Sequence, residues 1–115
     1  MKGKGCIVIH EEDDLIRELL ERWLGEAGYA VDGERHEAPC LVIANVPSPR
    51  GAQSLIESLQ AMYAAPILVL SGRFRRGLAG SAEAARRLGV KKVLPKPFTR
   101  KELLAAVTAS LEDEE

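Results

Sequence analysis

The sequence has no apolar run approaching the roughly 20 residues that a membrane-spanning helix needs. The apolar stretch that follows residues 1–5 is too short for a secretory signal peptide. The chain also lacks an excess of either charge, since its formal net charge is −1. A near-neutral chain has no overall attraction to nucleic acid or to a membrane surface. We therefore expect a cytoplasmic protein without membrane contact, in which nucleic-acid binding would depend on a local basic patch.

Cysteine is scarce, and the two cysteines, Cys6 and Cys40, fall in apolar stretches that predict buried strands. Cysteine often behaves as a small buried hydrophobe, and an intracellular chain keeps its thiols reduced. The pair therefore favours neither a disulfide nor a metal site. The rest of the composition, 115 residues of which 46% are hydrophobic and 29% charged, suits one compact domain over residues 1–115.

Several short apolar runs lead directly into polar residues. The most informative run is Leu41–Asn45, which is bounded by Pro39 and by a turn-rich segment at 47–51 and predicts a buried parallel strand. Similar runs lead into Glu11 and Glu12, into Ser71, and into Lys96; they cover residues 5–9, 67–70 and 90–95. Because open α/β sheets place their chemistry at the carboxyl ends of parallel strands, we expect these polar side chains to converge.

Apolar residues at helical spacing predict the helices that cover this sheet. The first stripe is Leu15, Ile16, Leu19, Leu20, Trp23 and Leu24, with Asp13 or Asp14 as N-cap and Gly28 as stop; Trp23 is expected to be a core residue. A second stripe is Leu55, Ile56, Leu59, Met62 and Tyr63, and a third helix runs from Ser81 to Leu88 before Gly89. The last helix follows a capping box, Thr99 to Glu102, and precedes an acidic tail at 112–115.

The link between the predicted second strand, Tyr29–Val31, and the third strand is unusually short. Only eight residues, Asp32 to Pro39, separate Val31 from Cys40, whereas a helical crossover needs a dozen or more. We therefore expect no helix here. Eight extended residues reach roughly 26 Å, and a parallel crossover past one strand needs roughly 18 Å. Without this helix, part of one sheet face would be left apolar and uncovered. Such a surface would suit a partner protein or a second copy of the chain.

The ordered set of polar residues resembles the receiver domain of bacterial two-component response regulators. The set is Glu11-Glu12, Asn45 with Pro49 four residues on, Ser71-Gly72, and Lys96-Pro97-Phe98. The resemblance covers nearly the whole chain. It implies a flavodoxin-like α/β fold, a three-layer sandwich around a five-stranded parallel sheet of order 2-1-3-4-5, here without the helix between strands two and three. It also implies a cis peptide bond before Pro97.

The family's functional roles carry over by position with one major departure. The resemblance makes Glu11 and Glu12 the acid pair that holds Mg²⁺, Ser71 the hydroxyl and Lys96 the ammonium that bond the phosphoryl group. The phosphoacceptor is an Asp in the family and is Asn45 here, and an amide is a poor nucleophile. Weak Mg²⁺ binding through Glu12 and the Asn45 oxygen is one outcome. The alternative is a structural ion pair between Lys96 and Glu11 or Glu12.

The output side departs from the family as well. Receivers commonly carry Tyr or Phe three residues before the Lys, and this switch position is Val93 here. We therefore expect a pseudo-receiver without enzymatic activity and with no required cofactor, which binds a protein partner or a second copy.

Two alternatives remain. One is a working phosphoacceptor in which Asp13 or Asp14 replaces Asn45. The other is anion or nucleic-acid binding through a basic segment, where Phe74 could stack on a base; we favour a solvated basic face instead. The basic residues are Arg73, Arg75, Arg76, Arg86, Arg87, Lys91 and Lys92.

Overall fold

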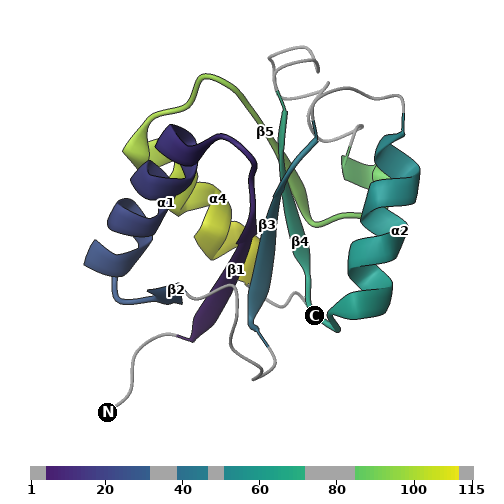
Figure 1. Ribbon diagram of the computed structural model, residues 1–115, viewed down its shortest axis with the longest axis horizontal. Helices are drawn as coiled ribbons and strands as arrows, with labels where there is room; N and C mark the ends of the chain where they lie inside the picture. The colour runs from purple at the N-terminus through teal and green to yellow at the C-terminus, as the bar shows by residue number, and fades with distance from the viewer. Residues whose placement is uncertain (1–4, 32–38, 47–50, 72–84, 112–115) are drawn as a thin grey trace.

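The computed structural model describes residues 5–31, 39–46, 51–71 and 85–111. Five strands and three helices follow in the order β1, α1, β2, β3, α2, β4, β5, α4 along these ranges (Figure 1). The strands are β1 (Cys6–His10), β2 (Ala30–Val31), β3 (Leu41–Asn45), β4 (Ile67–Ser71) and β5 (Lys92–Pro95). The helices are α1 (Asp14–Glu26), α2 (Ala52–Met62) and α4 (Arg100–Leu111), and residues 85–88 form one further helical turn.

The strands form one sheet of order β2-β1-β3-β4-β5, and every neighbouring pair is parallel. This confirms the predicted order and the parallel course of the second strand. The register also explains why a short link suffices. Val31 at the end of β2 and Leu41 at the start of β3 both lie opposite Ile7. The chain therefore has to cross β1 but has no strand length to retrace before β3 begins.

Helices cover the two faces of the sheet and complete the three layers (Figure 1). Side chains alternate between the faces along each strand, as the two-residue period of a strand requires. Ile7, Leu41, Ile43, Leu68 and Leu70 face α1 and α4, and pack on Leu20, Leu24, Leu103, Ala106 and Val107. Val8, Val42, Ala44, Val69 and Val93 face α2 and the turn at 85–88, and pack on Ala52, Ile56, Leu59 and Ala85.

Local signals fix the helix ends as the sequence predicts. The Asp13 carboxylate accepts from the Leu15 and Ile16 amides, so Asp13 is the N-cap of α1. Gly28 follows this helix with φ 103°, and Gly89 follows Leu88 with φ 76°. These left-handed backbone conformations favour glycine.

The capping box of α4 is complete. The Glu102 amide donates to the Thr99 hydroxyl at 3.1 Å, and the Glu102 carboxylate accepts from the Thr99 amide at 2.9 Å. Trp23 is half-buried against the α1–α4 core and meets the Phe98 ring edge-on, with centroids 6.5 Å apart. The core interpretation of Trp23 is confirmed.

The prediction of a buried apolar stripe is wrong for two residues. Leu15 is 76% exposed and Met62 is 67% exposed. Leu15 lies in the first turn of α1 beside the N-cap, and Met62 is the last residue of α2. The helical period places both on the inner stripe. Each nevertheless sits at a helix end, Leu15 in the first turn and Met62 at the last residue. The buried residues are Leu20 and Leu24 in α1, and Ala52, Ile56 and Leu59 in α2.

Three predictions fall partly or wholly outside the described residues. They are the absence of a helix over 32–38, the cap at Ser81 and the acidic tail at 112–115. The described strands show the expected uncovered face only in part. Val8 and Val42, which lie on that face in β1 and β3, are buried. Ala30 of β2, which lies opposite Cys6 on the same face, is exposed.

Candidate functional site

The strand register brings the predicted polar residues to one edge of the sheet. His10 lies opposite Ala44, Asn45 opposite Leu70, and Ser71 opposite Pro95. Glu11 and Lys96 each follow directly on one of these strands, so both stand at the same edge as Asn45 and Ser71. Convergence at the carboxyl ends follows from a parallel sheet in which the strands end in register.

Glu11 and Lys96 form an ion pair across this edge. Lys96 Nζ lies 3.5 Å from Glu11 Oε1, and the side chains are 23% and 2% exposed. The second carboxylate oxygen, Oε2, accepts from the Asp13 amide at 3.1 Å. Both oxygens of this buried carboxylate therefore have donors. The direct ion pair considered from the sequence is present, and Glu11 rather than Glu12 makes it.

The ion pair spans the middle of the sheet. Glu11 follows β1 and Lys96 follows β5, and β3 and β4 lie between those strands. Three strand spacings amount to roughly 14 Å, so the two side chains must reach toward one another over the ends of β3 and β4. Those ends carry Asn45 and Ser71. The backbone of Lys96 is held beside the end of β4, because its amide donates to the Ser71 carbonyl at 2.9 Å.

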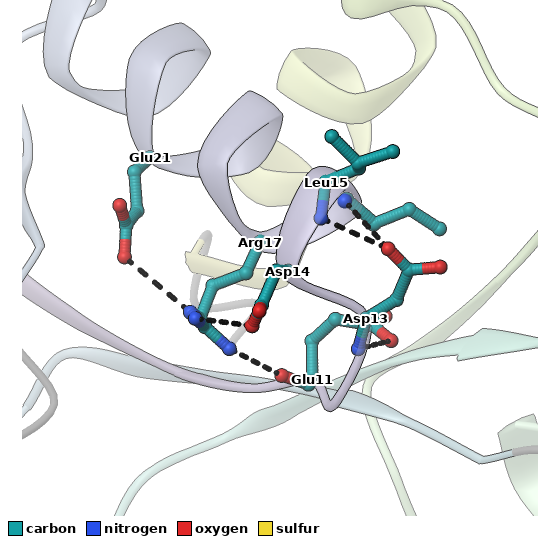
Figure 2. A network of polar contacts seen from close by, with 7 residues as sticks. Glu11, Asp13, Asp14, Leu15, Arg17 and Glu21 are labelled. Atoms are coloured by element: carbon teal, nitrogen blue, oxygen red, sulfur yellow. Dashed lines mark hydrogen bonds and ion pairs between the residues drawn. The ribbon is translucent and has the colours of Figure 1, made fainter.

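A network at the start of α1 holds the loop that carries Glu11 (Figure 2). Arg17 reaches back from the helix, and its Nη1 donates to the Glu11 carbonyl at 3.2 Å. Its Nη2 meets the Asp14 carboxylate at 2.7 Å, and its Nε lies 4.0 Å from Glu21. The i,i+3 and i,i+4 spacings of these acids are visible in the sequence. The contact to the Glu11 carbonyl has no such signal, so sequence reasoning missed Arg17.

Asp13 and Asp14, the alternative acceptors, already have partners. Asp13 caps α1 through its carboxylate, and Asp14 pairs with Arg17. Phosphorylation of either residue would replace one of these contacts. The structure gives each aspartate a structural role at the start of α1.

The two acids of the predicted pair lie in different surroundings. Glu12 is exposed, whereas Glu11 is turned to Lys96. Over 5–31, 39–46, 51–71 and 85–111, no group of three or more His, Cys, Asp or Glu side chains could hold a metal ion. Mg²⁺ requires near-octahedral oxygen ligands at about 2.0–2.1 Å. The one buried carboxylate here is already neutralised by an ammonium.

The other residues that the family resemblance assigns to the site lie at or near the ends of β3, β4 and β5. Asn45 is half-buried at the end of β3, and Ser71 is fully buried at the end of β4. Val93 is buried in β5 within the core that faces α2. The peptide bond between Lys96 and Pro97 is cis.

The basic segment is described only in its second half. Arg73, Arg75 and Arg76 lie outside the described residues. Arg86 and Arg87 are exposed on the turn at 85–88, Lys91 is exposed, and Lys92 is half-buried at the start of β5.

The opposite edge of the sheet holds both thiols. Cys6 and Cys40 are free and half-buried, and the Cys40 amide donates to the Cys6 carbonyl at 2.8 Å. Burial raises the pKa of the Cys40 thiol above its ordinary value of 9.0; nearby Cys6 adds to this, and a backbone hydrogen bond opposes it. Burial and nearby Cys40 raise the pKa of Tyr29 above 10.0.

Comparison with known proteins finds relatives among curated proteins and among solved structures. No family model matches the chain. Protein PetR of Rhodobacter capsulatus is 31% identical over 116 residues, which cover 91% of this chain and 48% of PetR. The transcriptional regulatory protein PdtaR of Mycobacterium tuberculosis is 33% identical over 114 residues, which cover 88% of this chain and 54% of PdtaR. The chain thus spans about half the length of these curated relatives.

Solved structures agree on the fold. A response regulator receiver protein from Burkholderia phymatum matches with a TM-score of 0.71 and 23% identity, over 94% of this chain and 95% of that protein. The chain therefore has the flavodoxin-like receiver fold, and the comparisons support its resemblance to response regulator receiver domains. In the ranges that the structure describes, no helix combines the length and the apolar character that crossing a membrane requires.

Proposed function

We propose that this chain is a receiver-like signalling domain of a two-component or phosphorelay system that is not phosphorylated at Asn45. It acts instead by binding a protein partner or a second copy of itself. The observation that carries the proposal is Asn45, which stands at the end of β3 where the family places its acceptor. An amide side chain is neutral and does not form the acyl phosphate that a carboxylate forms.

Other residues that the resemblance or the sequence singles out support the same conclusion. The Lys96 ammonium is paired with Glu11, and the aspartates Asp13 and Asp14 are engaged at the start of α1. The switch position holds the buried aliphatic Val93, which has no hydroxyl or aromatic ring to reorient. The domain then requires no cofactor, catalyses no reaction and works in the cytoplasm. The match to PetR and PdtaR covers about half of each of those proteins. The proposal therefore concerns the matched part and carries over nothing from the remainder.

A direct test is exposure to a small phosphodonor with Mg²⁺, followed by intact-mass measurement. A phosphorylatable receiver treated in parallel serves as the positive control. The proposal expects no added phosphoryl group on this chain. A single adduct would overturn it, and peptide mapping would then show whether Asp13 or Asp14 carries the group.

The protein-binding part of the proposal needs its own measurement. Light scattering over rising concentration distinguishes self-association from a foreign partner. A dimer that forms with concentration would identify a second copy as the partner, whereas a persistent monomer would assign the role to another protein.

The second candidate function is binding of an anion or nucleic acid through the basic segment. The favourable observation is the exposure of Arg86, Arg87 and Lys91 close together in sequence. Contacts to phosphates would make the binding fall steeply with salt. A mobility shift with DNA and RNA at low salt tests this, and the absence of a shift would exclude it.

A further inference from the structure

Glu11 has the features of a carboxylate whose cation belongs to the fold. Its side chain is 2% exposed, Lys96 Nζ lies 3.5 Å from one oxygen, and the Asp13 amide donates to the other at 3.1 Å. A buried carboxylate needs an opposite charge and hydrogen-bond donors to remain ionised. Here the chain supplies both.

Both ends of the ion pair are held independently of each other. On the Lys96 side, the backbone amide donates to the Ser71 carbonyl at the end of β4. On the Glu11 side, Arg17 donates to the Glu11 carbonyl and pairs with Asp14, which fixes the loop between β1 and α1 (Figure 2). Backbone contacts at each end therefore place the ammonium and the carboxylate beside each other.

We propose that the Lys96 ammonium is the resident cation beside Glu11 at the carboxyl ends of the strands. It takes the place of a divalent metal there, so that the fold is complete without Mg²⁺. This inference rests on the proposed function, because a domain without phosphoryl transfer needs no metal for it. Arg17 is a positioning residue, since it acts on the pocket through the Glu11 loop.

A metal would have to displace contacts that the fold already makes. Mg²⁺ would compete with Lys96 for one Glu11 oxygen and with the Asp13 amide for the other. Among the described side chains that the resemblance assigns to the site, it would gain the neutral oxygen of Asn45 and the exposed carboxylate of Glu12. Mg²⁺ gives up its water reluctantly and favours carboxylates in octahedral geometry. The exchange therefore favours the ammonium.

The test is thermal unfolding of the full chain with and without millimolar Mg²⁺. The wild-type midpoint should not change with Mg²⁺. Lys96→Met leaves the buried Glu11 carboxylate without its cation. The unfolding midpoint of this variant should therefore fall by about 10 °C. Added Mg²⁺ should then restore part of that loss, because the metal meets an unpaired carboxylate.

Three further variants separate this role from general damage. Lys101→Met, which removes an exposed lysine of α4, should unfold like the wild type. Lys96→Arg keeps a cation and should remain insensitive to Mg²⁺. The double variant Glu11→Gln with Lys96→Met removes both charges, so it should recover part of the lost midpoint and show no response to Mg²⁺. This double variant keeps the test informative if Lys96→Met does not fold.

The contrary results are distinct. A wild-type midpoint that rises with Mg²⁺, or a Lys96→Met variant as stable as the wild type and unresponsive to the metal, would overturn the inference. Neither result would change the proposed function, whose claim that Asn45 is not phosphorylated is tested separately with a phosphodonor. The two claims can therefore fail separately.

Discussion

The two ends of the sheet handle buried polarity in opposite ways. At the carboxyl ends of the strands, the buried Glu11 carboxylate pairs with the Lys96 ammonium. At the amino ends, the polar groups are neutral thiols, Cys6 and Cys40, and burial raises the pKa of Cys40 so that it stays protonated. One end keeps its charge by compensation, and the other end avoids charge.

This difference explains what each end can contribute. At the charged end, each member of the ion pair compensates the other, so removal of one member leaves a buried charge without its partner. A neutral end tolerates burial without a partner and contributes mainly packing. The carboxyl ends of the strands therefore carry the residues that the resemblance assigns to a receiver site, held in a structural ion pair.

The largest expected effect is removal of the buried acid. Glu11→Ala leaves the Lys96 ammonium and the Asp13 amide without their acceptor, so the free energy of unfolding should fall by about 3 kcal/mol. Chemical denaturation measures this free energy of unfolding. Glu12→Ala is the matched control, because its neighbouring carboxylate is exposed; it should change stability by less than about 0.5 kcal/mol. Equal effects of the two substitutions would contradict the account of this end.

The N-cap of α1 comes next. Asp13→Ala removes the acceptor of the Leu15 and Ile16 amides, and loss of such a cap costs about 1 kcal/mol. Glu18→Ala, an exposed substitution in the same helix, is the control. Denaturant midpoints at constant m-value would report the difference. An Asp13→Ala variant as stable as the control would show that the Glu11 loop does not depend on this cap.

At the amino end, stability should fall at alkaline pH. The folded state raises the pKa of Cys40, so as pH rises the unfolded chain loses the thiol proton first. The thiol contributes its full stability below pH 9.0 and loses it as pH rises through the folded-state pKa. In Cys40→Ala the decline should begin only near 10.0, where Tyr29 starts to contribute in the same direction. Denaturation curves at stepped pH would show this, and identical profiles for both proteins would contradict it.

The smallest expected effect is in α4. The Ser110 hydroxyl is buried without a hydrogen-bond partner among the described residues. An unsatisfied buried hydroxyl is unfavourable, so Ser110→Ala should leave stability unchanged or raise it by up to about 1 kcal/mol. Ser58→Ala, an exposed change in α2, provides the reference. A clear loss of stability in Ser110→Ala would mean that the hydroxyl has a partner after all.

Much of the fold could be predicted from local pattern. The apolar runs located the strands, and polar residues directly after them predicted convergence, because parallel strands end at one edge. Thr99 and Glu102 predicted a capping box from a four-residue signal. The strand order came from the family resemblance, and the chain length between Val31 and Cys40 allowed it.

The site was predictable only in part. Which of two adjacent acids turns inward depends on the path of the loop after β1, and the Asp13 amide and Arg17 set that path. These are contacts between backbone and side chain with no sequence period. Likewise, the stripes that included Leu15 and Met62 had the correct spacing, but spacing does not show where a helix ends relative to the sheet.

The most direct measurement of the central claim is an NMR titration of the isotope-labelled chain with Mg²⁺, with and without the phosphoryl mimic beryllofluoride. The account predicts that the amide signals of Glu11, Asn45 and Ser71 stay in place in both titrations, because Glu11 is already paired with Lys96 and Asn45, as proposed, is not an acceptor. Shifts at these amides that grow when the mimic is added would contradict it, since the pocket would then respond to a phosphoryl-like ligand.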